Sequence, residues 1–495
     1  MMGGTLASRI TGLLRNGLLA QFFSTAIVDA FVTAFRVPNL FRELLAEGAL
    51  TNSFVPVYKR LSREEGRALS GALLSLLVVV NGLLLLLAYA TAPWIANVLI
   101  ANALNVDIEL TTRLIRIVFP FLSAISLSAL AMGILNAEER FLAPAWAPVA
   151  LNVVTVLGMI IFPGHAVALA LAHVFGGVAQ LIVQVPVLAK HGLLPKLGVL
   201  WHPSLANVVL LMVPLTFTAS GRQILNVVTS RVITGIDAGA QGAFYLADLF
   251  LSLALGLFSI SPALSFYSRL AKQADNPQEY RHTLVDGLKF ITLLTLPAGF
   301  LLFLLAGPAV DALYNWRTIF SGVGMDPAMR VMTITVAAPL GLAVFPIGLF
   351  NLLIRTFYIR NRVKLSTILV LGFLSLQAIM YVVFAPAYGL AGVAWANVIV
   401  GWLQLMVMLR LVHRFEQFPG RELLVYIGKV AYAAILAAVF AGAVLTLVET
   451  KETYFLQIAR LVYGGGLYVA VFAVAGWLLG IPEITSLARR FTKSA

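Results

Sequence analysis

The chain of 495 residues has no cysteine and few charged residues. Without cysteine it can form no disulfide, no thiolate nucleophile and no zinc–sulfur centre. Charged residues make up 11% of the chain, whereas soluble domains carry about 25%. This scarcity excludes a soluble enzyme, a disordered chain and a nucleic-acid-binding domain, despite a net charge of +13.

Motifs for catalysis or cofactor binding are also missing. No Walker motif occurs, so ATP is not expected to be the direct energy source. The six histidines never fall at a metal-ligand spacing. We therefore expect no catalytic residue, no cofactor and no metal.

Apolar residues are what the chain has in abundance. Hydrophobic residues make up 60% of the chain, and its mean hydropathy is +0.95. Their long runs lack the alternation of an outer-membrane barrel, and at about 20 residues per span they predict an all-α polytopic membrane protein. The predicted fourteen spans cover residues 4–23, 25–58, 70–100, 110–136, 143–162, 166–189, 203–234, 241–270, 283–306, 329–357, 364–385, 389–412, 423–447 and 455–480. Prolines inside these spans predict kinks at Pro38, Pro120, Pro262, Pro339 and Pro346.

Lysine and arginine orient these spans. Nineteen of them lie in even-numbered connections, at the span ends that border them, or in the C-terminal tail, and three lie in or next to odd-numbered connections. The positive-inside rule then places both termini in the cytoplasm, which an even number of spans requires. The first span contains Arg9 and Arg15 and has no cleavage-site pattern, so we expect it to be retained rather than removed as a signal peptide.

Spans six and twelve resemble each other at an offset of 224 residues. Residues 172–181 match residues 396–405, and a basic residue follows each span, at Lys190 and Arg414. Chance similarity between two Ala/Val/Leu-rich helices is the alternative. A true repeat predicts two six-helix lobes in the same orientation, at 1–200 and 201–420, with two further helices and a tail at 421–495.

The first span carries a polar and cationic stripe. At 100° per residue its members fall within an arc of about 120°, and they are Ser8, Arg9, Gly12, Arg15 and Asn16. Such a face is not expected to meet lipid. It predicts either a water-filled lumen that attracts an anion, or structural pairing with Asp29 or Glu47.

The second span predicts a gate. Asp29, Arg36 and Glu43 are seven residues apart and share a helix face. Pro38 frees a backbone carbonyl that Asn39 can satisfy, which suits a hinge, although a static kink is the alternative.

These strings resemble the lipid II flippases of the MurJ (MviN) family, within the MOP (multidrug/oligosaccharidyl-lipid/polysaccharide) exporter superfamily. The similarity is strongest over the first 60 residues or so. It rests on Ser8-Arg9, Gly12 and Arg15; on Asp29-Ala30-Phe31, Pro38-Asn39-Leu40 and Arg42; on Ala46-Glu47-Gly48-Ala49 and Phe54-Val55-Pro56; and then on Phe119-Pro120, Gly133-Ile134-Leu135-Asn136, Arg140-Phe141, Pro144-Ala145, Ala147-Pro148 and Leu151-Asn152. Beyond residue 200 it rests mainly on the span pattern.

The resemblance implies two six-helix lobes around a cationic cavity, two C-terminal helices that form a groove for a polyprenyl tail, and alternating access. The implied partners are lipid II (undecaprenyl-pyrophosphate-linked disaccharide peptide) and membrane lipids, and cell-wall synthesis proteins are compatible with it. The implied location is the bacterial cytoplasmic membrane. Arg9, Arg15 and Arg42 match cavity arginines of the family, and Asp29, Asn39 and Glu47 match its gate and pairing positions.

One position departs from the family pattern. The eighth span of these proteins typically carries an arginine directly after an aspartate, and here Leu249 follows Asp248. Arg222 and Arg231 in the preceding span lie nine residues apart on opposite faces. We expect the deeper Arg222 to supply the missing charge and Arg231 to snorkel at the outer end. Asp248, with Asp237, is also the only candidate for a cation site in spans seven and eight.

Three other functions stay open. A flippase for another polyprenyl-linked glycan would also need a cationic cavity, and Leu249 leaves room for it. A multidrug/cation antiporter of the same superfamily should have an acidic cavity, whereas the deep charges here are mainly arginine. A non-transporting scaffold for cell-wall assembly would need no cationic stripe at Arg9 and Arg15.

Overall fold

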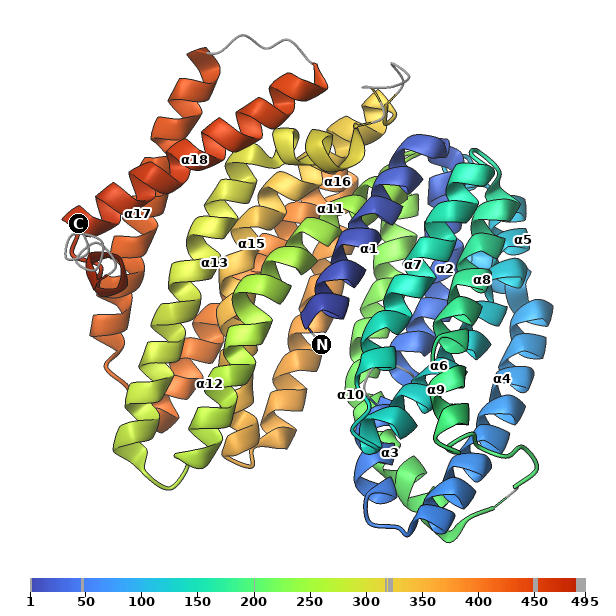
Figure 1. The fold of residues 1–495 in the computed structure, drawn as a ribbon. Helices are drawn as coiled ribbons and strands as arrows, with labels where there is room; N and C mark the ends of the chain where they lie inside the picture. Colours follow the sequence, from blue (N-terminus) through green and yellow to red (C-terminus); the bar gives the residue numbers. More distant parts are fainter. Residues whose placement is uncertain are drawn as a thin grey trace. The chain divides into compact units, whose positions relative to one another are not determined.

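The computed structural model describes residues 2–45, 49–199, 201–316, 318, 324–447 and 453–486, and all regular elements among them are helical. Figure 1 shows them as a ribbon. The chain divides by packing into two compact units, Met1–Gly242 and Ala243–Ala495. The helices that lie wholly in the first unit are α1 (Met2–Phe22), α2 (Thr25–Leu45), α3 (Ala49–Tyr58), α4 (Arg63–Leu99), α5 (Ile108–Val118), α6 (Pro120–Ala137), α7 (Leu142–Ile161), α8 (Ala166–Ile182), α9 (Val185–Lys190) and α10 (Pro203–Thr234).

The boundary between the units falls inside the next helix, α11. The remaining elements are α11 (Ala240–Leu255), the π-helix η1 (Gly256–Ile260), α12 (Ser261–Lys272), α13 (Pro277–Tyr314), α15 (Pro327–Ile359), α16 (Val363–Glu416), α17 (Gly420–Leu447) and α18 (Tyr454–Leu478).

Ten segments within the described residues are long and apolar enough to cross a membrane. Helices α1, α2 and α10, which carry the arginines of the predicted site, are not among the ten. The polytopic helical architecture predicted from composition is therefore what the structure has. The exact number of fourteen spans stays a prediction.

Helix α16 is two antiparallel helices. Its 54 residues would extend about 80 Å as one helix, far beyond a hydrocarbon core of about 30 Å. Gly389 breaks it with φ 58° and ψ −144°, a backbone conformation that glycine adopts most readily. Gln377 on one side donates a hydrogen bond to Asn397 on the other, so the chain folds back between them. This agrees with separate spans at 364–385 and 389–412.

The predicted kinks have different outcomes. Pro120 and Pro262 lie in the first turns of α6 and α12, where the helical path is interrupted, and proline is tolerated there because it needs no hydrogen bond. Pro38 lies inside α2, and α15 continues through Pro339 and Pro346. The predicted span 25–58 is described as α2 and α3, and residues 46–48 between them lie outside the described residues.

The repeat predicted from sequence has a structural counterpart in one local contact. His173 Nδ1 lies 2.9 Å from the carbonyl oxygen of Leu169, and Asn397 Nδ2 donates to the carbonyl oxygen of Val393 at 3.3 Å. Both pairs are separated by the offset of 224 residues. The boundaries predicted from the repeat stay a prediction, because ancestry and packing need not divide a chain at the same residue.

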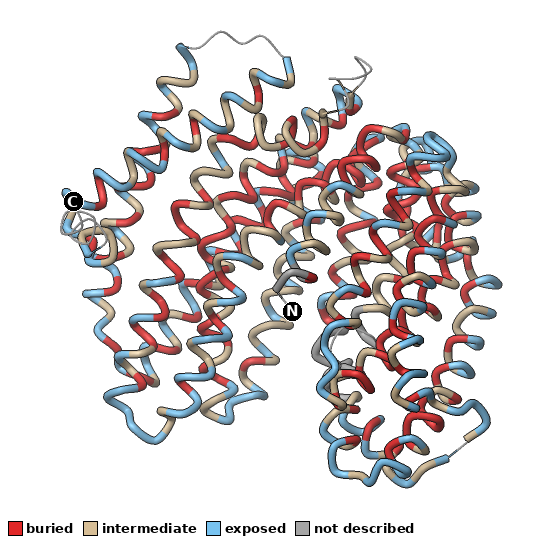
Figure 2. The backbone as a smooth tube through the Cα atoms, viewed as in Figure 1, coloured by how far each residue is buried: buried red, intermediate tan, exposed pale blue. Residues whose placement is uncertain are grey.

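Each unit has its own apolar core, shown in red in Figure 2. In the first unit Phe54, Leu73 and Ile134 are buried together, and in the second Tyr280 and Leu349 are. Within a bilayer, helices associate mainly by close packing, which small residues allow. Gly299 of α13 and Gly341 of α15 provide this, because a Cβ on Gly299 would lie 2.5 Å from the carbonyl oxygen of Gly341.

Packing assigns α10 to the first unit, where it contacts α2, α3 and α4. The arginine in its last turn, Arg231, donates to the carbonyl oxygens of Asn97 at 2.5 Å and Ile100 at 2.6 Å. These carbonyls end α4, where a helix leaves acceptors without partners and favours a cation. Thr234 Oγ1 adds a bond to Leu99 O at 3.2 Å. Arg231 therefore caps the C-terminal end of α4. Its side chain is also exposed, and the predicted snorkelling stays a prediction.

Replacing Arg231 with alanine should lower stability without removing a substrate contact. The loss of charged bonds to the end of α4 is expected to cost about 1–2 kcal/mol. The midpoint of thermal unfolding of the purified protein should fall by a few degrees, and Arg231→Lys should restore part of it. An unchanged midpoint for both variants would contradict the capping role.

Candidate functional site

The polar stripe of the first span lies on α1, which packs against α7. Its outward ridge is apolar, with Leu6, Ile10 and Leu14 exposed. Arg9 and Arg15 are half-buried and Asn16 is buried. Ser8 and Gly12 are half-buried as well. The helix therefore separates an apolar face from a cationic face, as its sequence predicts.

Arg15 is positioned by Asn152 of α7. Its Nη1 donates to Asn152 Oδ1 at 3.2 Å, and its Nη2 donates to Asn16 Oδ1 at 3.3 Å. The nitrogen of Asn152 donates back to α1, to Ser8 O at 3.1 Å and Thr11 Oγ1 at 3.2 Å. One amide thus fastens α1 to α7 and orients the guanidinium. Sequence reasoning noted Asn152 only as part of the family string and assigned it no role.

Asn152→Ala should impair the site by releasing Arg15. A hydrogen bond to a charged group contributes about 1.5–3 kcal/mol, so we expect transport to fall by about tenfold or more. Asn152→Asp should be at least as harmful, because a carboxylate beside Arg15 would compete with an anionic ligand. Transport by purified protein in vesicles measures both. Full activity of Asn152→Asp would contradict this role.

The second cationic group lies on α2. Arg42 Nε donates to Asn39 Oδ1 at 2.9 Å, one turn apart and just after the buried Pro38. The side-chain oxygen of Asn39 thus accepts from Arg42, and the expected contact of Asn39 with the carbonyl freed by Pro38 stays a prediction. The predicted partner Glu47 lies outside the described residues.

Asp29 meets backbone rather than an arginine of α1. One of its carboxyl oxygens accepts from the N–H of Gly239 at 2.5 Å and the other from the N–H of Gly242 at 2.7 Å. These groups belong to the start of α11, so Asp29 caps that helix from a distant part of the sequence. Asp29 is completely buried. A helix N-terminus favours a negatively charged partner, which explains an acidic residue deep in α2.

Arg36 binds the same segment as Asp29. Its Nη1 donates to Asn226 O at 3.1 Å. In the amide orientation that satisfies both groups, the Gln241 side-chain oxygen accepts from Nε and Nη2 at 2.7 Å each. The face shared by Asp29 and Arg36 was predicted from spacing, but its contacts with residues 190 or more positions away were not.

Arg222, which is predicted to compensate for Leu249, differs in its surroundings from Arg231 on the same helix. Arg222 is exposed on α10, and within the described part of the chain no hydrogen bond or ion pair of its side chain is found. Asp248 and Leu249 are half-buried on α11. Arg231, by contrast, donates hydrogen bonds to the carbonyl oxygens at the end of α4. Of the two arginines on α10, Arg222 is thus the one available to a ligand.

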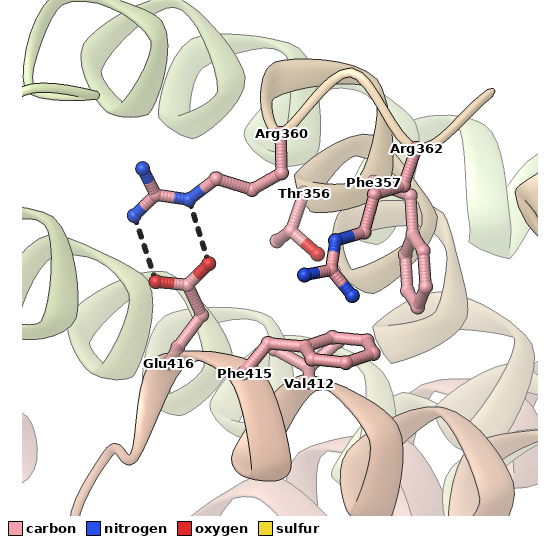
Figure 3. A pocket seen from close by; sticks show the side chains of 7 residues that line it. All are labelled: Thr356, Phe357, Arg360, Arg362, Val412, Phe415 and Glu416. Atoms are coloured by element: carbon pink, nitrogen blue, oxygen red, sulfur yellow. Dashed lines mark hydrogen bonds and ion pairs between the residues drawn. The ribbon is translucent and has the colours of Figure 1, made fainter.

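A small pocket at the end of α15 is closed by its own side chains. Figure 3 shows Arg360 forming two parallel bonds to Glu416, at 2.7 and 2.8 Å, while Arg362 lies over Phe415. The bonds to Glu416 raise the pKa of Arg360 above its ordinary value. Arg360 Nη1 also donates to Ala274 O at 2.8 Å. These contacts tie the ends of helices together and leave no free group for a ligand.

No group of three or more metal-ligating side chains occurs among the described residues. His173, the most deeply buried histidine there, packs against Phe31 with the two rings tilted and their centroids 4.6 Å apart. Its surroundings are those of a packed core residue.

Comparisons with a family model and with curated proteins point to the same family. The family model described as Lipid II flippase MurJ matches residues 19–463. The chain is 32% identical to the lipid II flippase MurJ of Burkholderia cenocepacia over 410 residues, covering 79% of this chain and 78% of that protein. It is 29% identical to a probable lipid II flippase MurJ of Bdellovibrio bacteriovorus, covering 99% and 95%.

Solved structures share the fold. A lipid II flippase MurJ in an inward closed conformation matches with a TM-score of 0.79 and 22% identity, covering 97% of this chain and all (100%) of that one. An inward-facing multidrug transporter of the MATE family in the MOP superfamily matches with a TM-score of 0.67 and 15% identity, covering 83% and 96%.

Proposed function

This chain belongs to the lipid II flippase MurJ family, and from that premise we propose that it moves lipid II across the bacterial cytoplasmic membrane, from the inner to the outer leaflet. It is a transporter rather than an enzyme. Arginines hold the pyrophosphate of the headgroup, and they are Arg9, Arg15, Arg42 and Arg222. Ser8, Asp29, Pro38, Asn39, Glu47 and Asp248 act as gate and pairing residues.

The observation that best supports this proposal is that Arg15 is held by uncharged hydrogen-bond partners. Both hydrogen-bond acceptors found for it are neutral amide oxygens, of Asn152 and Asn16. An arginine whose partners are neutral amides can still form an ion pair with an anionic ligand. Charged residues inside a membrane protein are costly and generally mark a substrate or ion site. A pyrophosphate offers oxygens at the spacing that a guanidinium binds in pairs.

The substrate's apolar part suits the same protein. A polyprenyl chain can stay among lipids while only its polar headgroup crosses. Helices α17 and α18 pack on each other and on α13, and we assign them to guiding that tail. Both are strongly apolar, with exposed residues such as Val439 and Val462 along their length.

Movement of the headgroup requires a gate that opens alternately to each side. We assign this to the start of α11, which Asp29 caps at Gly239 and Gly242. Opening must break these two bonds or carry them along with the helix. The energy comes from the membrane potential, an ion gradient or consumption of lipid II on the outer side.

Arg222→Ala should abolish transport nearly as fully as Arg15→Ala, because Arg222 replaces the charge that Leu249 lacks. Leu249→Arg in the Arg222→Ala background should restore part of it. The measurement is growth of a strain that depends on the variant, together with lipid II exposed on the outer face. Unimpaired growth with Arg222→Ala would overturn this assignment.

Leu249 favours one second candidate, a flippase for a different polyprenyl-linked glycan. Depletion of the protein in its native cell separates the two. Lipid II exposure on the outer face should fall if lipid II is the substrate. Undiminished exposure would reject the first function and leave the second. A scaffold without transport would instead be favoured by an Arg9→Ala/Arg15→Ala double variant that still supports growth.

A further inference from the structure

The last turns of α13 form a separate piece, residues 306–314, which we call the end segment. The helical path of α13 is interrupted at Leu305, whose φ of −105° and ψ of 19° are not helical. Pro308 follows three residues later and lacks the N–H that would bond the carbonyl oxygen of Leu304. A proline inside a helix is a common cause of a sharp kink. The end segment is therefore set off from the rest of α13.

Helix α18 contacts the end segment and the kink before it. The hydroxyl of Tyr454, the first residue of α18, donates to the carbonyl oxygen of Ala312 at 3.2 Å. At the kink, Gly464 of α18 leaves room for Leu305, because a Cβ on Gly464 would lie only 3.3 Å from Leu305 Cδ2. A shift of the first turn of α18 therefore reaches the end segment through Tyr454.

The end segment also contacts α11. The hydroxyl of Tyr314 donates to the carbonyl oxygen of Leu246 at 3.1 Å, and its ring lies edge-on to that of Phe250, with centroids 5.7 Å apart. Leu246 and Phe250 are one turn apart on α11, and Tyr314 is completely buried. One buried side chain thus connects the end segment to the helix to which we assign the gate.

A paired ion contact fixes the end segment to α15. Asp311 is only 2% exposed, and its two oxygens accept from Nε and Nη2 of Arg330 at 2.6 Å each. Such bidentate contacts are strong and directional. Asp311, Ala312 and Tyr314 lie within about one turn and bind three different helices, α15, α18 and α11. Because Asp311 is held, a displacement at Ala312 turns the segment about this point and moves Tyr314.

We propose that the end segment transmits occupation of α17 and α18 by the polyprenyl tail to the gate helix α11. A tail seated against α18 shifts its first turn, Tyr454 carries the shift to Ala312, and Tyr314 passes it to Leu246. Coupling between two places requires an element with two arrangements that both places bias. The kink at Leu305 lets the end segment be that element.

This inference rests on the proposed function and adds regulation to it. The start of α11 is released for movement only when the tail is in place. A headgroup without a long tail can then bind the arginines and still leave α11 unmoved. The relay thus ties movement of the headgroup to the presence of a complete lipid.

Four tyrosine-to-phenylalanine substitutions, each of which removes one hydroxyl, test this relay. Tyr454→Phe and Tyr314→Phe break its two ends. Tyr468→Phe is the control for general support, because the Tyr468 hydroxyl donates to the carbonyl oxygen of Pro297 at 2.9 Å, on the other side of the kink. Tyr463→Phe is the control for the substitution itself, since the Tyr463 hydroxyl has no hydrogen-bond partner among the described residues.

Hydrogen exchange of residues 240–255 reports on α11. It is measured in the full-length protein in vesicles without ligand, with lipid II, and with a short-tailed analogue that has the same headgroup. Lipid II is expected to change the exchange rate by about fivefold or more, the lower end of usual coupling factors, and the analogue is not. Tyr454→Phe and Tyr314→Phe should each abolish this difference between the ligands, whereas Tyr468→Phe and Tyr463→Phe should keep it.

Equal effects of lipid II and the analogue on α11, in unsubstituted protein that transports lipid II, would overturn the relay and leave the proposed function intact. The relay is also overturned if Tyr454→Phe keeps the difference, or if Tyr468→Phe abolishes it as fully as Tyr454→Phe does. No binding or transport of lipid II by the unsubstituted protein would overturn the proposed function, and the relay with it.

Discussion

Replacing Arg15 with alanine is expected to lower outward transport of lipid II by at least about thirtyfold. Removing one member of a buried charged contact costs about 2–5 kcal/mol, and every 1.4 kcal/mol is a factor of ten. Arg15 is half-buried, and the amides of Asn152 and Asn16 orient it without neutralising its charge, so we expect its contact with the pyrophosphate to fall in this range. Lipid II exposed on the outer face, in cells or in vesicles that contain the purified variant, gives the measurement.

Two further variants sharpen this result. Arg15→Lys keeps the charge but loses the paired geometry, so its transport should lie between that of the alanine variant and the unsubstituted protein. Arg60→Ala is the control, because Arg60 is an exposed arginine that follows α3 in the same unit. Equal transport by Arg15→Ala and Arg60→Ala would remove Arg15 from the substrate site.

Replacing Asp29 with alanine is expected to open the start of α11 and to lower transport at least about tenfold. The N–H groups of Gly239 and Gly242 would lose their acceptors. A buried donor left without a partner costs about 1–3 kcal/mol. The first turn of α11 should therefore open more readily, and the gate that we assign to it should close less completely. Asp29→Asn should be intermediate, because its oxygen can still accept from one of the two groups.

Hydrogen exchange locates the cause of the Asp29 effect. The amides of Gly239 and Gly242 should exchange faster in Asp29→Ala, while amides in the core around Leu73 stay protected. Loss of protection throughout the first unit would indicate general unfolding instead. Unchanged exchange at both glycines would show that the cap does not hold this turn.

The cationic face of α1 was predictable from sequence because a helix has a fixed period. Arg9 and Arg15 fall on one side of α1 whatever surrounds it. Pairing was not predictable in the same way. The sequence offered Asp29 and Glu47 as partners for the stripe, whereas the structure gives Arg15 the amide of Asn152, 137 residues away.

Arg222 and Arg231 illustrate the same limit. Their spacing predicted opposite faces. Both side chains are exposed, and only Arg231 has hydrogen bonds to the end of α4 among the described residues. A helix C-terminus attracts any cation that reaches it, but which cation reaches it depends on how α10 packs against α4. Snorkelling of Arg231 stays a prediction, and the sequence did not indicate its hydrogen bonds to the carbonyl oxygens of Asn97 and Ile100.

The scarcity of charge and the long apolar runs determined by themselves that this is a helical membrane protein, because the bilayer sets the length and polarity of anything that crosses it. The sequence also determined which arginines are deep, since each is costly there. Only the tertiary structure decided what each one contacts: Arg15 is oriented by Asn152, Arg231 caps α4, and Arg36 contacts Gln241 beside the glycines that Asp29 binds. Hydrogen bonds act over about 3 Å, so these roles depend on contacts between helices far apart in the chain.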